Sequence, residues 1–283
     1  MKLKDIYINS NKPVISYEVF PPKETDKIDN LLEELSILNK FNPAFVSLTC
    51  SAGGSGENNT EATLEILNKK CSTQIMPHLT CICNTKENIL NKINTYKNMG
   101  IENILALRGD IPENISLCAQ DFRYANDLTQ FLKQHTDFSI AVAGYPEGHI
   151  ESPDIDTDIV HLKQKVQSGA DAIFTQLFFS NDKLYSYIDK LKNKGISIPI
   201  IPGIMPIISY KQIQRMTKLA KITIPQKLQS DIEKYKDDSV SMKEMGIEFA
   251  TKQCIDLVNN GIKGLHFFTL DKSYSTAKIL NNI

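Results

Sequence analysis

Eight short apolar runs recur along the whole chain, and this pattern constrains the fold more than any other feature. Most runs are continuous rather than alternating, which is typical of strands buried on both faces of a parallel sheet. The segments between them carry apolar residues at helical spacing. The strands are therefore predicted at residues 14–20, 45–52, 74–81, 103–110, 139–146, 172–179, 198–205 and 264–270.

The predicted helices carry start and stop signals at the expected ends. Ser or Thr precedes several of them and Gly follows, as helix caps do. The candidate caps are Thr25, Thr85 and Ser180 at helix starts, Gly100 and Gly195 at helix ends, and a capping box of Ser241 and Glu244 opening a helix that runs to Gly261.

A strand followed by a helix, repeated eight times in 283 residues, predicts an α/β fold of the (β/α)8 TIM-barrel type. Residues 221–243 are more than a minimal barrel requires at this point of the chain, and we expect them to add a helix before the eighth strand. No linker-like tract divides the chain, so residues 1–283 are expected to form a single catalytic domain. The alternative, a doubly wound sheet, would carry a G-x-G-x-x-G turn after its first strand, and the Gly cluster at residues 53–56 does not fit that spacing.

Charge and cysteine content exclude several classes of protein. Lys and Arg total 32 against 33 Asp and Glu, which argues against a general nucleic-acid binder. The longest apolar run, Ile198 to Ile208, is far shorter than the ~20 residues that span a bilayer. No signal peptide is recognisable, and we expect a cytoplasmic protein. The six cysteines lack C-x-x-C spacing, which predicts reduced thiols rather than a disulfide framework or a zinc site.

Polar residues interrupt the apolar strands at their carboxyl ends, where the catalytic groups of TIM barrels gather. Any one of them could be a satisfied polar group at the edge of the sheet. Their occurrence on six strands favours a functional site. These residues are Glu18, Thr49, His78, Arg108, Asp110, Tyr145, Glu147, His149 and Gln176.

Two of these residues, Glu18 and Asp110, are carboxylates from the first and fourth strands. Tyr17 and Phe20 flank Glu18, and an apolar setting favours a protonated carboxyl that suits a general acid. Arg108 precedes Asp110 by two residues and would keep it ionised. Arg108 could face Asp110 or a ligand phosphate, and the Arg-Gly-Asp segment could equally be a surface turn.

Other chemistries of the same fold find less support. A metal hydrolase would want clustered His and Asp ligands, often H-x-H on the first strand, whereas His78 and His149 stand alone. We therefore expect no metal. A Schiff-base aldolase would want a Lys inside a strand, and none of the eight strands supplies one. The phosphate-binding site that is common after the seventh and eighth strands of such barrels needs glycines, and residues 269–273 contain none.

Seven sequence strings, which together reach along the whole chain, resemble one family. They are SYEVFPPK at 16–23, PHLTC at 77–81, LRGDIP at 107–112, GYPEGH at 144–149, TQLFF at 175–179, IPGIMP at 201–206 and HFFTL at 266–270. In this order they strongly resemble methylenetetrahydrofolate reductase. The length is similar to that of the bacterial-type enzyme, which is a catalytic barrel without the eukaryotic regulatory domain.

The resemblance implies a flavoprotein barrel with non-covalently bound FAD. Such an oxidoreductase acts on a CH–NH group and reduces 5,10-methylenetetrahydrofolate to 5-methyltetrahydrofolate. Its hydride comes from NADH or NADPH, and the two half-reactions alternate at one site by a ping-pong mechanism. The product belongs to one-carbon metabolism and methionine synthesis. The resemblance further implies a homo-oligomer with no nucleic-acid or membrane partner.

The resemblance also assigns roles to individual residues. Glu18 matches the general acid that protonates N10 of the folate as its five-membered ring opens. Asp110 matches a catalytic residue near both flavin and pterin. The substrate contacts would be Glu18, Asp110, Gln176, Gln212 and Lys272, with Gln176 shared by folate and nicotinamide. The flavin contacts would be Thr49, His78, Arg108, Gly109, Asp110, Tyr124, Ala125, Tyr145, His149, Asp158 and Lys165.

Three positions depart from the family's pattern. His161 and Gln164 stand where relatives carry Asn and Arg, which removes one cation beside the FAD diphosphate. Lys272 stands where relatives can carry Arg, and Lys cannot form the same bidentate grip.

Two other functions remain as alternatives. Another flavin barrel, such as proline dehydrogenase, would lack the string from Glu18 to Pro22. A barrel without catalysis could serve as a partner-binding protein, although the polar strand ends argue against this. The colour of the purified protein distinguishes them, because a flavoprotein is yellow and bleaches under NADH without air.

Overall fold

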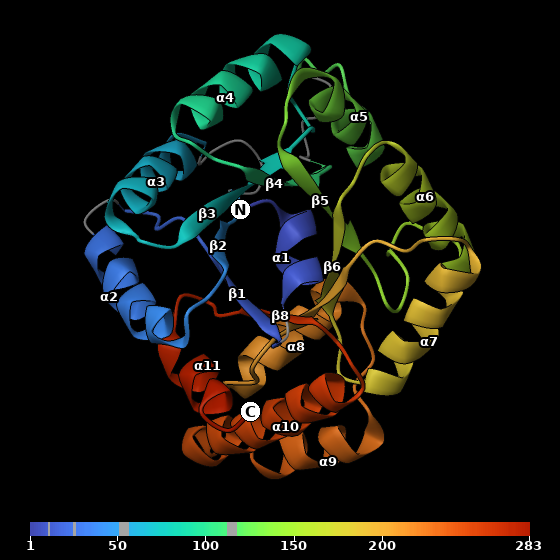
Figure 1. The fold of residues 1–283 in the computed structure, drawn as a ribbon. Coiled ribbons are helices and arrows are strands. Elements are labelled where there is room, and N and C mark those ends of the chain that lie inside the picture. Colours follow the sequence, from blue (N-terminus) through green and yellow to red (C-terminus); the bar gives the residue numbers. More distant parts are fainter. Residues whose placement is uncertain (11, 25–26, 51–56, 112–117) are drawn as a thin grey trace.

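The chain folds into a closed barrel of eight parallel strands in sequence order, and β1 pairs with β8 to close it. The structure is a computed structural model and describes residues 1–283 apart from 11, 25–26, 51–56 and 112–117. Figure 1 looks into the barrel and shows the helices as a ring around the strands. The predicted TIM barrel is confirmed. The Gly cluster at 53–56 and the candidate cap Thr25 lie outside the described residues.

Seven of the eight strands begin at the predicted residue, and all eight end earlier than predicted. Thr49, Arg108 and Tyr145 lie just beyond the observed ends, in the loops at the barrel mouth. Two of them still make a backbone hydrogen bond to the neighbouring strand's extension: the N–H of Thr49 donates to the carbonyl of Val19, and the carbonyl of Arg108 accepts from the N–H of Ile82. The strands are β1 (Val14–Val19), β2 (Phe45–Leu48), β3 (Gln74–Thr80), β4 (Asn103–Leu107), β5 (Ser139–Gly144), β6 (Ala172–Leu177), β7 (Ile200–Ile204) and β8 (Gly264–Phe268).

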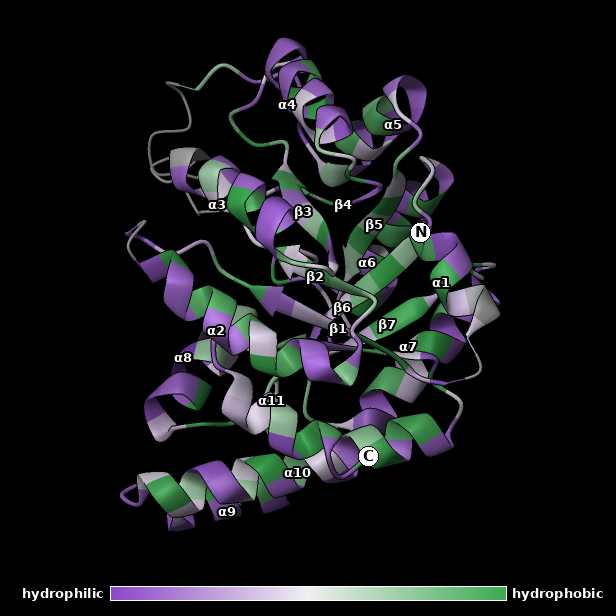
Figure 2. Ribbon diagram, turned by 60° about the vertical axis from the view of Figure 1, so that its left-hand side comes forward, coloured by the Kyte–Doolittle hydropathy of each residue, from purple (hydrophilic) through white to green (hydrophobic). Residues whose placement is uncertain are grey.

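The helices follow the predicted pattern, including the extra one before β8. They are α1 (Leu3–Asn9), α2 (Ile28–Leu38), α3 (Glu57–Lys70), α4 (Lys86–Asn98), α5 (Ala125–His135), α6 (Ile155–Gln167), α7 (Asn181–Asn193), α8 (Tyr210–Ala220), α9 (Gln226–Lys234), α10 (Ser239–Asn259) and α11 (Ser273–Leu280). The extra helix is α9. It lies beside α10 at the periphery (Figure 2), where Leu228 and Ile232 pack with Met242 of α10.

The predicted helix caps are partly confirmed. Thr85 accepts a hydrogen bond from the backbone N–H of Asn88 and caps α4. The expected capping box of Ser241 and Glu244 is wrong, because α10 begins earlier. Its cap is Asp238, whose carboxylate accepts from the N–H of Val240 and of Ser241 and holds the Ser241 hydroxyl.

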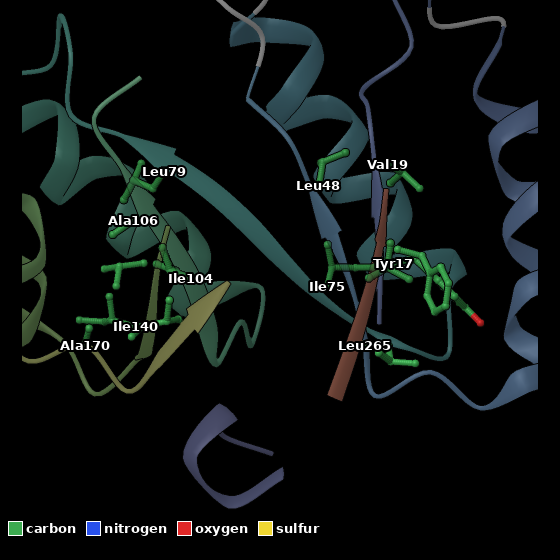
Figure 3. Packing of buried hydrophobic residues seen from close by; sticks show 14 of the residues in the cluster. Tyr17, Val19, Leu48, Ile75, Leu79, Ile104, Ala106, Ile140, Ala170 and Leu265 are labelled. Carbon is green, nitrogen blue, oxygen red and sulfur yellow. The ribbon is translucent and has the colours of Figure 1, made fainter. Parts of the chain in front are cut away.

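The barrel has two apolar surfaces, because successive residues of a strand point to opposite faces. The outer face carries Tyr17, Val19 and Leu48 against the helices (Figure 3). The inner face, near the start of the strands, packs Phe45, Met76 and Phe174 with residues of α1. In Figure 1, α1 lies within the ring of strands. Helix α1 thus fills the amino-terminal end of the barrel and leaves the opposite end for chemistry.

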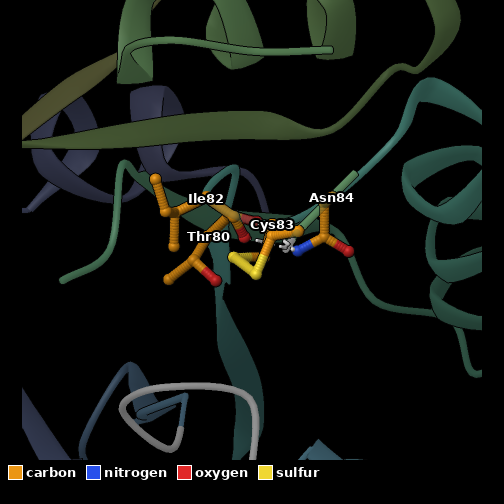
Figure 4. Close-up of a disulfide and its surroundings, with 5 residues drawn as sticks. Thr80, Ile82, Cys83 and Asn84 are labelled. Atoms are coloured by element: carbon orange, nitrogen blue, oxygen red, sulfur yellow. Dashed lines mark hydrogen bonds between the residues drawn. A yellow bond between two sulfur atoms is a disulfide. The ribbon is translucent and has the colours of Figure 1, made fainter. Parts of the chain in front are cut away.

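One pair of cysteines contradicts the predicted reduced thiols. Cys83 follows β3 and forms a disulfide with Cys118, which lies between β4 and α5 (Figure 4). The two are 35 residues apart in sequence. They meet because β3 and β4 are neighbours in the barrel, and no local spacing motif marks such a pair. Cys71, Cys81 and Cys254 keep free thiols, as predicted.

Candidate active site

Glu18 lies near the carboxyl end of β1 with only 13% of its side chain exposed. Its Oε2 faces Nε2 of His78 at 3.5 Å and Nε2 of His266 at 3.8 Å. The predicted apolar setting is wrong. Strand alternation sends Tyr17 to the outer face, where its hydroxyl donates to the carbonyl of Leu38, so sequence neighbours do not surround the carboxylate.

Two serines complete the polar cluster beneath Glu18. The Oγ of Ser47 lies 3.2 Å from Nε2 of His78 and 3.4 Å from Nε2 of His266. The Oγ of Ser16 lies 2.8 Å from Nδ1 of His266. Both serines and both histidines are buried. Sequence reasoning singled out His78 but missed Ser16, Ser47 and His266, although a period of two on β1, β2 and β8 would have placed all three inside the barrel.

His78 is neutral at physiological pH. Burial lowers the pKa of its imidazole to about 4, and nearby His266 lowers it further, while the charge of Glu18 acts in the opposite direction. A neutral imidazole beside the carboxylate can offer it an N–H without forming an ion pair. His78 therefore faces Glu18 as a polar group rather than as a compensating charge.

A cavity of about 340 Å³ opens beyond the ends of β4 and β5 and reaches helices α5 and α6. This volume is within the range of small-molecule sites. The cavity brings together seven of the eleven flavin contacts implied by the resemblance: Arg108, Tyr124, Ala125, Tyr145, His149, Asp158 and Lys165. His161 and Gln164, the two departures from the family pattern, also line it.

Lys165 supplies a cation to this cavity. Its Nζ donates to the carbonyl of Ala143 at 2.6 Å and lies 5.7 Å from the ring centre of Tyr145. Burial lowers the pKa of Lys165 to about 8, opposed by the charge of Asp158. Burial raises the pKa of Asp158, with Lys165 opposing that shift in turn. The two groups therefore stabilise each other's charged forms.

Two buried oxygens near the mouth lack a protein partner. Asp158 Oδ2 and Thr49 Oγ1 are buried and make no hydrogen bond within the described part of the chain. Leaving a buried polar atom unpaired is costly, and such atoms commonly await a ligand or a water. Asp158 lines the cavity, so its free oxygen is available to a ligand hydroxyl.

Arg108 does not pair with Asp110. Its guanidinium makes two hydrogen bonds to the carboxylate of Glu151, at 2.6 Å and 2.7 Å. Gly109 between them has a φ of +88°, and an added Cβ would lie 2.7 Å from Cγ2 of Ile82, so this turn requires glycine. Asp110 is exposed.

Asp110 nevertheless acts electrostatically on the cavity. Burial raises the pKa of Tyr145 to about 12, the charge of Asp158 raises it further, that of Arg108 lowers it, and that of Asp110 makes a smaller contribution that raises it. The field of the Asp110 carboxylate thus reaches a residue that lines the cavity.

The three remaining substrate residues implied by the resemblance are engaged with protein groups. Gln176, at the end of β6, accepts from the N–H of Leu177. The amide of Gln212 accepts from Ile208 N–H and donates to the carbonyl of Pro206, which holds the loop after β7. Lys272 is exposed, and its Nζ lies 3.3 Å from Oε1 of Glu34. The structure therefore gives Gln212 and Lys272 structural contacts.

Glu147 is a strand-end residue whose carboxylate holds neighbouring segments of the protein together, rather than a candidate ligand contact. Its carboxylate binds the ammonium of Lys183 and accepts from both the N–H and the hydroxyl of Thr223. These contacts connect the loop after β5 with α7 and with the segment after α8. They account for Glu147 without a ligand.

Asp271 is a further residue that sequence reasoning missed. Its Oδ1 accepts from the N–H of Phe20 at 2.8 Å and so joins the loop after β8 to the loop after β1, beside Glu18. Burial raises the pKa of Asp271 to about 6. Leu270 and Asp271 both have positive φ, a conformation that no local glycine signals.

The part of the chain that the structure describes contains neither a clustered metal site nor a membrane-spanning helix. No group of three or more His, Cys, Asp or Glu side chains there is arranged to hold a metal ion. No described helix is both long and apolar enough to pass through a bilayer.

Comparison with known proteins identifies the family. A sequence model of methylenetetrahydrofolate reductase matches residues 2–283. A probable methylenetetrahydrofolate reductase (NADH) of Oryza sativa is 39% identical over 96% of this chain, which covers 48% of the rice protein. The 5,10-methylenetetrahydrofolate reductase of Escherichia coli is 32% identical over 95% of this chain and 90% of its own length. The chain thus spans about half the length of the plant relative and most of the bacterial one.

Solved structures agree with the fold. An uncharacterised protein from Clostridium thermocellum that binds two copies of 5-methyl-5,6,7,8-tetrahydrofolic acid superposes with a TM-score of 0.65 at 16% identity, over 98% of this chain and 96% of its own. A dihydropteroate synthase from Xanthomonas albilineans gives a TM-score of 0.55 at 12% identity, over 96% of this chain and 91% of its own. At these identities the likeness concerns the fold alone. The match of the family model over residues 2–283 shows that this chain belongs to the methylenetetrahydrofolate reductase family.

Proposed function

We propose that residues 1–283 form one catalytic unit that reduces 5,10-methylenetetrahydrofolate to 5-methyltetrahydrofolate, with FAD as cofactor and NADH or NADPH as hydride donor. One observation carries the proposal. A carboxylic acid, Glu18, lies inside the barrel near its mouth, and a cavity at the same end is lined by seven residues of the implied flavin site. Names of relatives specify NADH in rice and NADPH in Caenorhabditis elegans, so the choice of nicotinamide stays open.

The cavity suits FAD by its chemistry. Arg108 and Lys165 are the arginine and lysine of the described lining, and they would face the negative diphosphate. The unpaired oxygen of Asp158, which lines the cavity, would accept a hydrogen bond from a hydroxyl group of the ribityl or ribose parts. The unpaired Oγ1 of Thr49 lies outside this lining, after β2, and would accept one there. Tyr124 and Tyr145 offer aromatic faces. His161 and Gln164 add no fixed positive charge, so the diphosphate would depend on Arg108 and Lys165.

Bound FAD would supply a two-electron carrier that accepts a hydride from the nicotinamide and passes it to the folate. The protein's own contribution is the proton. Glu18 would donate it to N10 of the folate, whose five-membered ring then opens to an electrophilic iminium. His78 and His266 would hold the carboxylate, and the apolar floor made with α1 keeps the base of the barrel closed to water.

The test follows the flavin spectrum. The purified protein should be yellow, bleach when NADH or NADPH is added without air, and regain its colour when 5,10-methylenetetrahydrofolate is added. Reoxidation by methylenetetrahydrofolate that yields 5-methyltetrahydrofolate supports the proposal. A colourless protein that binds no added FAD would support the partner-binding alternative. Bleaching by proline would instead support a proline dehydrogenase.

Two further expectations belong to this proposal. The resemblance implies a cytoplasmic homo-oligomer. Light scattering on the purified protein, compared with the 31.9 kDa chain, tests the oligomeric state. A mass equal to one chain at micromolar concentration would contradict it.

A further inference from the structure

The two oxygens of the Glu18 side chain have different surroundings. Both imidazole contacts, from His78 at 3.5 Å and from His266 at 3.8 Å, reach the same oxygen, Oε2. The other oxygen, Oε1, has no hydrogen-bond or ion-pair partner in the described ranges of the chain. Both contacts are longer than an ordinary N–H···O hydrogen bond. An acid with imidazole nitrogens facing one oxygen, as N–H groups would, carries its proton on the other oxygen.

The ring of His266 cannot turn freely. It is 1% exposed and lies among Phe45, Phe174 and Phe268, with ring centres 6.2, 4.9 and 5.7 Å away. Its Nδ1 is 2.8 Å from the Ser16 hydroxyl. Aromatic packing therefore fixes the plane of the ring, and Ser16 fixes which nitrogen points away from Glu18.

The proton position on His266 follows from this arrangement. A neutral imidazole has one N–H and one lone pair. If Nδ1 carried the proton, the lone pair of Nε2 would face Oε2 of Glu18, which in the protonated acid is the carbonyl oxygen and also offers only lone pairs. The Ser16 hydroxyl can instead donate to Nδ1, which leaves the proton on Nε2, directed at Ser47 and Glu18. This second arrangement places opposite partial charges next to each other.

We propose that Ser16 and His266 form a positioning pair, in which Ser16 sets the tautomer of His266 and His266 directs the acid proton of Glu18 onto Oε1. The inference rests on the proposed function, in which Glu18 is the general acid. In the step itself the Oε1–H bond breaks and its electron pair stays on the carboxylate. The lone pair of N10 forms the new N–H bond, and the N10–CH2 bond of the ring then opens. The N–H groups on Oε2 stabilise the carboxylate that remains.

Three variants separate this role from a structural one. His266→Asn keeps a polar group at the level of Nδ1 and loses the one at Nε2. His266→Gln places an amide near the former Nε2 position. Ser16→Ala removes the hydroxyl that sets the tautomer. His135→Gln is the matched control, because His135 lies exposed at the end of α5.

The two half-reactions are measured separately by stopped flow. In His266→Asn the folate half-reaction at saturating folate should fall about 10- to 100-fold, less than the ~10²–10⁴ that a positioned general acid itself contributes. Its KM for folate should change less than about threefold, and flavin reduction by NADH should stay at the wild-type rate. His266→Gln should recover part of the loss, and His135→Gln should match the wild type.

The tautomer itself is read by ¹⁵N NMR of the imidazole nitrogens. Among the signals of the five histidines, that of His266 is the one missing from the spectrum of His266→Gln. The wild type should show a protonated Nε2 and a bare Nδ1 at His266, and Ser16→Ala should lose this preference. A proton on Nδ1 in the wild type overturns the pairing, whatever the enzyme reduces. A folate half-reaction at the wild-type rate in His266→Asn, or an equal loss in both half-reactions, overturns the positioning role. A wild type that never reduces methylenetetrahydrofolate overturns the proposed function instead.

Discussion

Nη1 and Nη2 of Arg108 donate to Oε2 and Oε1 of Glu151, at 2.6 Å and 2.7 Å. Arg108 follows β4, Glu151 lies in the loop before α6, and both line the candidate flavin cavity. The hydrogen bonds from Arg108 lower the pKa of Glu151, so the pair is ionised across the physiological range. A bound phosphate must therefore compete with Glu151 for the guanidinium.

Removing this competitor should strengthen FAD binding. Glu151→Gln keeps the shape of the side chain and removes one negative charge from the cavity lining. We expect the dissociation constant for FAD to fall about fivefold, which corresponds to the ~1 kcal/mol at the upper end for an exposed ion pair. Quenching of flavin fluorescence on titrating the apoprotein measures it. Asp156→Asn, an exposed residue on α6, is the control. Weaker binding in Glu151→Gln would mean that Glu151 orients Arg108 rather than competing for it.

Loss of the acid should separate the two half-reactions. Glu18→Gln should bind FAD and accept a hydride from NADH as the wild type does, because that step needs no proton on the folate. Folate reduction should fall by at least the ~10²–10⁴ typical of general acid catalysis. Stopped-flow spectroscopy records both steps. Folate reduction at the wild-type rate would exclude Glu18 as the acid.

Asp110 should act on the potential of the flavin. A carboxylate near the isoalloxazine disfavours the anionic reduced form, so Asp110→Asn should raise the midpoint potential. The reduced flavin is then a weaker hydride donor, and folate reduction should slow more than NADH oxidation. Titration against a redox dye at fixed pH gives the potential. An unchanged or lower midpoint potential in Asp110→Asn would show that Asp110 does not act on the flavin electrostatically. Its role would then be folate binding or the structure of its turn.

Lys165 should make FAD binding depend on pH. The pKa of Lys165 is about 8 in the free protein, below its ordinary value, and a bound diphosphate would raise it again. FAD binding then takes up a proton above pH 8. Affinity should be nearly constant well below pH 8, begin to fall as the pH approaches 8, and fall by up to about tenfold per unit above 8, until the raised pKa is reached.

The control for this pH dependence is another lysine of the same helix. Lys165→Gln should bind FAD more weakly and show no such slope, whereas Lys163→Gln, which does not line the cavity, should keep it. A slope that persists in Lys165→Gln would assign the titration to another group of the cavity, such as Tyr145 or His149.

The disulfide should stabilise the folded chain. Closing a segment of 35 residues corresponds to about 4 kcal/mol in the chain-entropy account. Cys83→Ser and Cys118→Ser should each lower the urea midpoint, and the two decreases should be equal. The double variant should have no lower a urea midpoint than either single variant. A thiol reagent should reduce the wild type to the stability of the variants. Unequal or additive losses would show that the two cysteines act independently.

Strand order and the residues near the barrel mouth could be predicted because both follow from local pattern. Continuous apolar runs identified all eight strands, and the polar residues at or just beyond their carboxyl ends identified Glu18 and Arg108. Seven of the implied flavin contacts meet in one cavity because they follow neighbouring strands or lie on the two helices beside them. Gln212 and Lys272 illustrate the limit. Their positions match the family's, but only the structure shows that protein groups engage their polar atoms.

The sequence by itself determined the barrel, its extra helix α9 and membership of the family, because strand period, cap residues and motif strings are properties of short segments. Only the tertiary structure decided which side chains meet. Closure of the barrel pairs β1 with β8 and brings Ser16 to His266 across 250 positions, and it sets Glu18 on imidazoles instead of its apolar neighbours. The pairs Arg108–Glu151 and Cys83–Cys118 depend on loop conformations between adjacent strands. Contacts of this kind are fixed by the packing of distant segments, and no local spacing encodes them.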